Sequence, residues 1–565
     1  MAKTVAIGIQ DFETVRSNNY FYIDKTGFIK EWWEGGDSTT LITRPRRFGK
    51  TLNMSMVEVF FSVDYADRGD LFEGLSIWEE EKYRNMQGTY PVISLSFARV
   101  KEDNYEKAKE KICEVLRSLY IEFSFLLDSD VLIEADKNFF RQVLAEEMKE
   151  TVATSALYQL SNYLYRYYGK KVIILLDEYD TPMQEAYVHG FWEELVGFTR
   201  SLFNSTFKTN PFLDRGIMTG ITRVSRESIF SDLNHLKVVT TTSDEYATAF
   251  GFMEEEVFAA LEAFGLAEEK DRVKFWYDGF VFGEYRDIYN PWSILNFLDT
   301  KKYGAYWANT SANSLAGKLI REGNRKIKAS FEQLLKGEHI FCSIDEQIVY
   351  DQLGDNEEAV WSLLAASGYL KILFYDKADE IPEGADVMYE LALTNYEVKQ
   401  MFLGMVKGWF KPVKADYNDF INAMLTDDLK AMNAYLNRIT MQTFSYFDVA
   451  KNKLGDETER FYHGFMLGLL VDLREKYVIT SNRESGFGRY DVVLEPRSKE
   501  ERAFILEFKT YDKADEEGLK ETVQAALKQI EEKQYEADLL AKGISAERIR
   551  KYGFAFEGKK VLIGG

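Results

Sequence analysis

Three consecutive residues of this 565-residue chain, Gly49, Lys50 and Thr51, could bind the phosphates of a nucleotide. They follow a short apolar run, TTLIT, and precede a stretch with the spacing of an amphipathic helix. In phosphate-binding loops, backbone N–H groups at a helix start hold phosphate, a lysine reaches the terminal phosphates, and a hydroxyl binds Mg²⁺. The full pattern, G-x-x-x-x-G-K-[ST], has a glycine where this chain has Arg44, and this departure puts the loop geometry in question. The nearby Arg46 and Arg47 add positive charge.

A second segment, VIILLDEYDTP, ends an apolar run with Asp177 and Glu178. Two carboxylates at the end of a buried strand can hold Mg²⁺ and orient the attacking water during phosphate hydrolysis. A solvated acidic turn would give the same residues, but the upstream RRFGKT segment favours a nucleotide site. Arg223 follows another apolar run, GIMTG, where it could sense the terminal phosphate, although a surface arginine explains it equally well.

A second candidate site lies near the C-terminus. Asp491 opens the run YDVVLEP, and Glu507 and Lys509 lie in the run AFILEFKTY. Because side chains two residues apart on a strand point to the same face, Glu507 and Lys509 share a face. Two carboxylates suit Mg²⁺ or Mn²⁺, and a nearby lysine can position hydroxide or stabilise charge on a phosphate under attack. An exposed ion pair would also explain Glu-x-Lys, but Asp491 on the preceding strand favours metal-dependent phosphodiester cleavage.

Further residues could complete this second site. Glu459, in the helix-like segment ETERFYHGFMLGLL, could be a metal ligand or an ordinary acid near a helix start. His463 is expected to be a packed helix residue. Four residues could contact nucleic acid, although surface positions and a plain amphipathic helix would explain them nearly as well: Arg483, Arg489, Gln529 and Tyr535.

The elements that must position these residues alternate between strand and helix up to about residue 240. Apolar runs at 39–43, 92–97, 172–176 and 216–220 are separated by helical patterns, which predicts a parallel sheet covered on both faces. Four domains are expected from the changes of pattern: a phosphate-loop domain at 1–250, a helical lid at 251–324, a mostly helical domain with a winged-helix pattern at 325–420, and an α/β domain at 421–565.

The composition limits the classes of function. With 70 Lys+Arg against 92 Asp+Glu, the net charge is −22, so any contact with nucleic acid requires a local basic patch. Neither the two cysteines nor the four histidines show the spacing of a disulfide framework or a zinc site. The chain has no apolar run of about 18 residues and no secretory signal pattern, so we expect a cytoplasmic protein without a membrane span.

These segments together resemble a widespread bacterial family that joins a predicted AAA-ATPase-like domain to a C-terminal PD-(D/E)xK nuclease domain. The similarity covers most of the chain and includes TLITRPRRFGKTLNMSM, LLDEYDTP, GITRVSRESIFSDLN, WYDGFVFG, FYHGFMLGLL, NRESGFGRYD and ILEFK. Arg44 in place of the first glycine is a trait of this family. The resemblance implies an α/β fold class, Lys50 and Thr51 for phosphate and Mg²⁺, Asp177 and Glu178 for Mg²⁺ and water, and a nuclease core of Glu459, Asp491, Glu507 and Lys509.

We therefore expect a protein that binds and hydrolyses ATP, or is regulated by it, and that cleaves DNA with Mg²⁺ or Mn²⁺. One alternative is an ATP-switched protein whose nuclease fold only grips nucleic acid. The intact acidic pair argues against it, since a pure binder has no need of carboxylates that face phosphate. Another alternative, a nucleotide-binding scaffold for a protein partner, is motivated by the acidic surface and the abundant aromatic residues. A homo-oligomer is also compatible with the resemblance, because AAA-like domains often form rings.

Overall fold

The chain forms two compact units in the computed structural model. The first contains Met1–Ala316 and His339–Val398, and the second contains Gly317–Glu338 and Lys399–Gly565. Segment 317–338 thus packs with the C-terminal part, although the chain returns to the first unit directly after it. The structure describes all residues except 1–2, 224–229, 231–232, 234, 308–312, 346–355, 376–386, 410–413, 444–461, 464, 468, 471–472, 475, 482–483, 486–487, 490, 499, 512–515 and 558–559.

A five-stranded parallel sheet in the order β2-β3-β4-β1-β5 forms the centre of the first unit. Its strands are β1 (Thr39–Thr43), β2 (Val92–Ser96), β3 (Val172–Asp177), β4 (Leu213–Gly220) and β5 (Leu236–Val239). Every residue of β1 and β3 is buried, as expected for strands covered on both faces. This confirms the predicted parallel sheet and adds β5, which the sequence patterns did not indicate.

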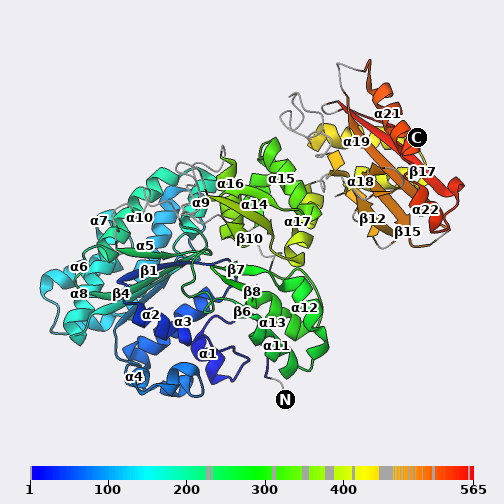
Figure 1. The fold of residues 1–565 in the computed structure, drawn as a ribbon. Helices are drawn as coiled ribbons and strands as arrows, with labels where there is room; N and C mark the ends of the chain where they lie inside the picture. The colour runs from blue at the N-terminus through cyan, green and yellow to red at the C-terminus, as the bar shows by residue number, and fades with distance from the viewer. Residues whose placement is uncertain are drawn as a thin grey trace. The chain divides into compact units, whose positions relative to one another are not determined.

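Helices cover both faces of this sheet (Figure 1). On one side lie α1 (Phe12–Ser17), α2 (Gly27–Gly35) and α3 (Lys50–Phe61), and on the other lie α5 (Tyr105–Glu122), α8 (Ala156–Tyr168) and α10 (Trp192–Phe207). Further helices in this part of the unit are α4 (Glu81–Arg84), α6 (Glu134–Leu144), α7 (Glu150–Ala153) and α9 (Thr181–His189).

The expected helical lid contains three helices and a small sheet. The helices are α11 (Glu254–Ala263), α12 (Lys270–Tyr277) and α13 (Pro291–Thr300). The strands β6 (Phe252–Met253), β7 (Phe280–Phe282) and β8 (Tyr285–Tyr289) form an antiparallel sheet that the sequence patterns did not indicate. Phe21 and Ile23 of the N-terminal segment pack against the core of these helices.

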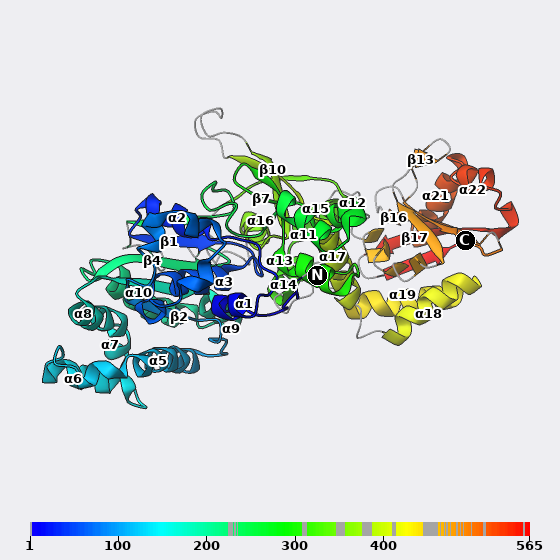
Figure 2. The ribbon, with the colours of Figure 1, turned by 90° about the horizontal axis from the view of Figure 1, so that it is seen from below.

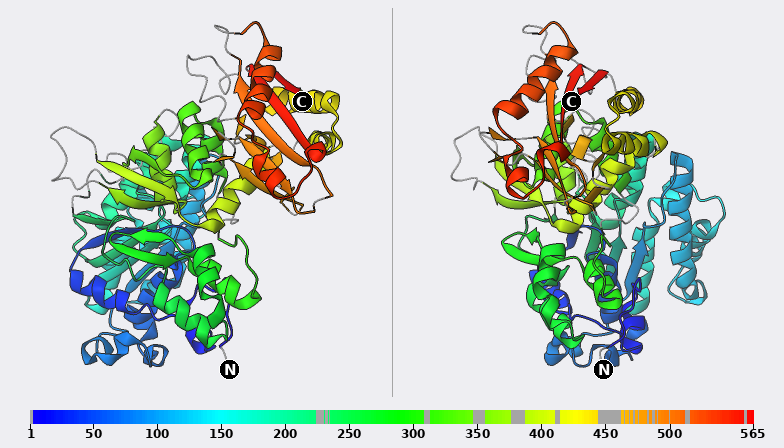
Figure 3. Two further views of the ribbon diagram at one scale, coloured as in Figure 1. Left: turned by 45° about the vertical axis from the view of Figure 1, so that its right-hand side comes forward. Right: turned by 90° about the vertical axis from the view of Figure 1, so that its right-hand side faces the viewer.

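The middle of the chain contains helices and a small sheet. Helices α14 (Asn313–Glu322) and α15 (Arg325–Lys336) come first in the sequence, and α16 (Glu357–Ala366) packs against an antiparallel sheet in the order β10-β11-β9. Its strands are β9 (Ile340–Ser343), β10 (Leu370–Tyr375) and β11 (Met388–Leu393), of which β10 and β11 pair along their length (Figure 3). Helix α17 (Tyr396–Trp409) follows this sheet.

A second five-stranded sheet, in the order β12-β15-β16-β17-β18, forms the centre of the C-terminal unit. Its strands are β12 (Tyr477–Ser481), β15 (Val492–Pro496), β16 (Ala503–Thr510), β17 (Ile549–Glu557) and β18 (Lys560–Gly564). Only β16 and β17 pair in parallel. Strands β17 and β18 are the last two elements of the described chain. The helices are α18 (Lys414–Thr426) and α19 (Leu429–Thr443), which lie side by side (Figure 2), and α21 (Leu519–Glu532) and α22 (Ala537–Ala541).

No helix in the described part of the chain is both long enough and apolar enough to cross a membrane.

Candidate functional site

The predicted phosphate loop connects β1 to α3. Arg47 and Gly49 adopt left-handed backbone angles, with φ of 64° and 79°. Gly49 is the N-cap of α3 and has no side chain that could satisfy the first N–H groups of the helix, so these groups can serve as donors to an anion. Lys50 is buried, and its Nζ donates to the carbonyls of Arg44 and Pro45 at 2.9 Å each. Burial lowers the pKa of Lys50.

Arg44, which occupies the first glycine position of the pattern, points away from this loop surface. Its guanidinium donates to the carbonyl of Thr43 at 3.1 Å, to that of Glu245 at 3.0 Å and to that of Thr240. It also lies over the ring of Phe282, 4.5 Å from the centroid. Arg44 is fully buried, and burial lowers its pKa to about 9. The side chain therefore ties the loop to residues 240–245.

The two predicted magnesium ligands of the first unit are in contact. Thr51 Oγ1 donates to Asp177 Oδ2 at 2.7 Å, and the hydroxyl of Thr219, on β4, donates to Asp177 Oδ1. Burial raises the pKa of Asp177, against the lowering effect of the hydrogen bonds from Thr219 and Thr51. Because β4 lies between β1 and β3, the sheet order brings these three side chains together. A hydroxyl and a carboxylate side by side are oxygen ligands that suit Mg²⁺.

The two acids that follow Asp177 have different surroundings. Glu178 has a left-handed φ of 52°, and its Oε2 accepts from Thr181 Oγ1 at 3.0 Å. Asp180 is buried, and its Oδ2 accepts from the N–H groups of Ile221 and Thr222 at 3.0 and 2.9 Å. Asp180 thus holds the segment after β4, while Glu178 borders the cavity beside the phosphate loop.

This cavity has a volume of about 300 Å³, and its lining contains both cationic and apolar side chains. The cationic side chains include Arg46, Arg47, Lys50 and Lys101, and the apolar ones include Phe21, Ile23, Phe252, Trp292 and Leu295. The guanidinium of Arg47 lies 4.3 Å from the ring centroid of Trp292. Cationic side chains can hold phosphates, and apolar and aromatic side chains can hold a base. Sequence reasoning missed the N-terminal and lid residues, because their apolar side chains also fit an ordinary core.

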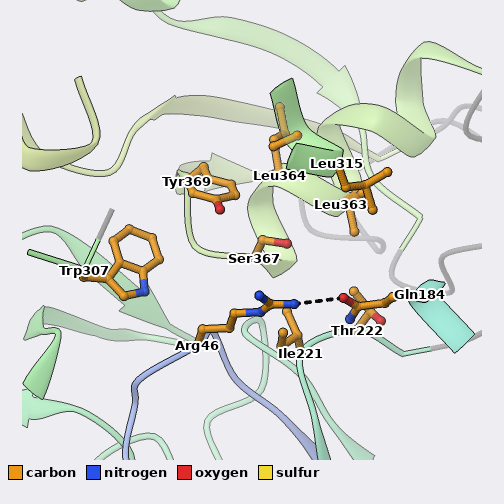
Figure 4. A pocket seen from close by; sticks show the side chains of 11 residues that line it. Arg46, Gln184, Ile221, Thr222, Trp307, Leu315, Leu363, Leu364, Ser367 and Tyr369 are labelled. Carbon is orange, nitrogen blue, oxygen red and sulfur yellow. Dashed lines mark hydrogen bonds between the residues drawn. The ribbon is translucent and has the colours of Figure 1, made fainter. Parts of the chain in front are cut away.

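Two predicted nucleotide ligands, Arg46 and Arg223, line smaller cavities. Arg46 Nη2 donates to Gln184 Oε1 at 3.1 Å and lines a cavity of about 40 Å³ (Figure 4). Its walls also include Thr222 and Leu315. Arg223 lines a separate cavity of about 20 Å³ and is not among the described residues that line the 300 Å³ cavity. The structure thus brings the loop residues and Glu178 together and places Arg223 elsewhere.

The second candidate site lies where β15 begins beside β16. Val492 pairs with Leu506, so Asp491 is next to Glu507, and the Asp491 N–H donates to Glu507 Oε2 at 3.4 Å. Asp491 Oδ2 accepts from the Phe508 N–H at 2.8 Å. Glu507 is 2% exposed. Burial raises the pKa of Asp491, against the effect of positive groups nearby that include Lys509.

Other predicted residues surround this acidic pair or lie outside the described chain. Gln529 Nε2, from α21, donates to Glu507 Oε1 and to the hydroxyl oxygen of Tyr535, whose ring is buried. These contacts indicate that Gln529 and Tyr535 hold Glu507 in place, and they favour this role over the predicted contact with nucleic acid. The structure describes only the backbone of Arg489, in the short strand β14 (Gly488–Arg489), paired with β13 (Glu484–Ser485). Glu459 and Arg483 lie outside the described residues.

His463, expected only as a packed helix residue, contacts this site. Its Nε2 lies 2.9 Å from the Asp491 carbonyl oxygen, and its Nδ1 lies 3.0 Å from Glu332 Oε1 of α15. Glu332 precedes His463 by 131 residues, so no local pattern could have linked the two. The sequence carries one signal that could have indicated a role for α15. Glu332 and Lys336 are charged residues one turn apart on the inner face of this helix.

Comparison with known proteins assigns the two ends of the chain. Residues 6–230 match a family model described as predicted AAA-ATPase, and residues 457–564 match the model of the PD-(D/E)XK nuclease superfamily. The chain is also 27% identical over 403 residues to an Azotobacter chroococcum mcd 1 protein described as "Uncharacterized protein in vnfD 5'region", covering 70% of this chain and 68% of that protein. The chain therefore joins an N-terminal domain of the predicted AAA-ATPase-like family to a C-terminal domain of the PD-(D/E)XK nuclease superfamily.

Proposed function

We propose that this protein is an ATP-regulated nuclease that cleaves phosphodiester bonds of DNA with Mg²⁺ or Mn²⁺. The observation that carries the proposal is the meeting of Asp491 and Glu507 at adjacent strand positions, with Lys509 on the same face of β16 as Glu507. A merely DNA-binding surface gains nothing from two carboxylates that face phosphate.

The cationic residues of the phosphate loop and the 300 Å³ cavity beside it support ATP as the ligand of the first unit. The phosphates would lie at the start of α3, where Lys50 would exchange the carbonyls of its own loop for phosphate oxygens. Thr51 and Asp177 would hold Mg²⁺, and Glu178 would orient the attacking water. Arg46 and Arg47 add positive charge to the lining of the cavity, and its apolar side chains would hold the base. A bound Mg²⁺ would neutralise charge on the terminal phosphates.

The nuclease unit supplies the groups that hydrolysis of a phosphodiester requires. Asp491 and Glu507 would hold the divalent ion, whose chemistry is to polarise the phosphate and lower the pKa of a bound water. Lys509 would stabilise the charge that develops on the phosphate. Gln529 holds the Glu507 carboxylate through its hydrogen bond and thereby limits the positions that this ligand can adopt.

A route for regulation by ATP begins at Arg46. This residue lines the 300 Å³ cavity and also the 40 Å³ cavity, whose wall includes Leu315 and Ala316 of α14. The chain continues from α14 into α15, which belongs to the C-terminal unit. A change in the position of Arg46 on nucleotide binding would therefore act on the segment that leads from the first unit to the second.

The test is cleavage of labelled single- and double-stranded DNA with Mg²⁺ or Mn²⁺, with and without ATP. We expect Lys509→Ala to lose at least about 100-fold in cleavage rate and to bind ATP normally, since it removes only a charge-stabilising group. Lys520→Ala, which removes an exposed lysine of α21, is the matched control. Full cleavage by Lys509→Ala would refute the site assignment. No cleavage by the wild-type protein under any condition would favour an ATP-switched binding protein.

A further inference from the structure

A chain of contacts links three buried or half-buried side chains, those of Lys336, Glu332 and His463, and ends at Asp491 of the nuclease site. Lys336 Nζ lies 2.6 Å from Glu332 Oε1, and His463 Nδ1 lies 3.0 Å from the same oxygen. His463 Nε2 contacts the carbonyl oxygen of Asp491 at 2.9 Å. The side chains of His463 and Glu332 are only 3% and 7% exposed. Glu332 and Lys336 lie on α15, outside both ranges that match the family models.

The hydrogen-bond directions in this chain are set by the chemistry of the partners. A backbone carbonyl can only accept, so His463 Nε2 donates to Asp491. His463 Nδ1 lies within hydrogen-bond distance of Glu332 Oε1. Both ring nitrogens thus have a partner, and the orientation of the ring is set at both ends. Lys336 contributes a positive partner to Glu332, which offsets the cost of burying a carboxylate.

Asp491 is consequently held by two separate contacts. Its carbonyl oxygen accepts from His463, and its carboxylate Oδ2 accepts from the Phe508 N–H at 2.8 Å. These contacts fix the position of the Asp491 backbone and carboxylate relative to Glu507 on the neighbouring strand. Metal affinity depends strongly on such outer contacts, because they set the orientation of the ligands.

We propose that His463 and Glu332 are positioning residues for the metal site of the nuclease unit: Glu332 orients His463, and His463 fixes Asp491. This inference rests on the proposed metal-binding role of Asp491 and Glu507. A buried charged pair is seldom the most stabilising choice for packing alone, since apolar residues of similar volume often stabilise as well or better. The site is thus completed by α15, a helix that precedes the return of the chain to the first unit at His339.

Mn²⁺ binding to the full-length protein, measured by calorimetry without DNA or ATP, tests the inference. All variants carry Asp177→Asn and Asp278→Asn, so that neither the Thr51–Asp177 pair nor the acid cluster of Glu254, Asp278 and Asp287 contributes Mn²⁺ binding. We expect Glu332→Ala and His463→Leu to weaken Mn²⁺ binding about 10-fold or more. His463→Gln should retain most of the affinity, because its amide N–H can still donate to the Asp491 carbonyl. Glu338→Ala, which removes an exposed carboxylate just after α15, is the matched control.

The outcomes separate this inference from the proposed function. If Asp491→Asn abolishes Mn²⁺ binding while Glu332→Ala and His463→Leu stay within twofold of the parent, the positioning role is refuted and the metal site stands. If Asp491→Asn also binds Mn²⁺ normally, the metal site is refuted and the inference falls with it. Thermal unfolding checks that each variant is folded. Should His463→Leu not fold, Lys336→Met gives the second test, with weaker Mn²⁺ binding expected and unchanged binding counting against the inference.

Discussion

Thr51 and Asp177 are separated by 126 residues in the sequence and share a hydrogen bond of 2.7 Å between Thr51 Oγ1 and Asp177 Oδ2. The first residue belongs to the opening turn of α3 and the second ends β3. The pair is further held by Thr219, which donates to the other oxygen of the same carboxylate. The two hydrogen bonds therefore hold a hydroxyl and a carboxylate side by side, which is the arrangement that the proposed Mg²⁺ site requires.

Replacing Asp177 by asparagine tests this pair. We expect Asp177→Asn to bind ATP without Mg²⁺ as the wild-type protein does, because the phosphate loop is unchanged. Mg²⁺ should no longer strengthen ATP binding, since the amide lacks the negative charge that Mg²⁺ requires. Calorimetry with ATP, in the presence and absence of Mg²⁺, measures both effects. A Mg²⁺ dependence equal to that of the wild-type protein would show that Asp177 does not hold the ion.

Arg44→Gly supplies the first glycine of the common phosphate-loop pattern, yet we expect this substitution to destabilise the first unit. The substitution leaves a cavity and removes the donors to the carbonyls of Thr240 and Glu245, at a cost of roughly 2–4 kcal/mol in the free energy of unfolding. Arg47→Gly is the matched control, because the φ of 64° at Arg47 suits glycine and the expected change is within about 1 kcal/mol. Denaturant unfolding compares the two variants, and equal stabilities would contradict the anchoring role of Arg44.

A cluster of acids in the lid predicts a pH dependence of stability. Oxygens of Glu254, Asp278 and Asp287 lie within 4.8 Å of one another, and Lys274 pairs with the first and the third of these residues. Burial, followed by the hydrogen bond and the negative charge of Asp287, raises the pKa of Asp278 from 3.8 to about 7. The folded protein therefore binds one more proton than the unfolded chain between these two values, and its stability falls as the pH rises through that window.

Asp278→Asn mimics the protonated state and should remove this dependence. We expect the variant to exceed the wild-type protein in free energy of unfolding by on the order of 2 kcal/mol at pH 8, which allows for screening by solvent and by Lys274. The difference should shrink as the pH falls towards 4. Thermal unfolding across this range measures it, with Asp271→Asn, at an exposed position of α12, as the control. A difference that does not change with pH would rule out Asp278 as the titrating group.

The edge of β18 is covered by side chains of α19 instead of by another strand. Asn433 exchanges two hydrogen bonds with the backbone of Ile563, at 2.9 and 2.8 Å, and Asn437 does the same with Val561, at 2.6 and 2.9 Å. The match arises because four helical residues rise about 6 Å and two strand residues span about 6.6 Å. The two asparagines thus satisfy backbone groups that would otherwise be available for pairing with a second chain.

Asn437→Ala should therefore act on both stability and solubility. We expect a loss of about 1–3 kcal/mol in the free energy of unfolding, because two backbone groups lose their partners. Light scattering should also show concentration-dependent association through the uncovered edge. Lys430→Ala removes an exposed side chain from the same helix and should change neither quantity. The covering role would be disproved by an Asn437→Ala protein that matches Lys430→Ala in both measurements.

The local pattern of residues was sufficient to predict the elements that carry the motifs. The apolar runs predicted β1 and β3, because a strand buried on both faces must be apolar along its length. The period of two predicted that Glu507 and Lys509 share a face of β16. Strands β5, β7 and β8 were missed, since they are short and, in β8, largely exposed, and short runs of this kind carry no clear period.

The contacts between distant residues were decided only by the tertiary structure. The sequence predicted Asp177 and Thr51 as partners of one ion, but their contact depends on the strand order that places β4 between β1 and β3. Arg44 is bonded to carbonyls of the segment 240–245, and His463 contacts Glu332, which lies 131 residues earlier in the chain. Periodicity reports which face of an element is buried, and it contains no information about which other element covers that face.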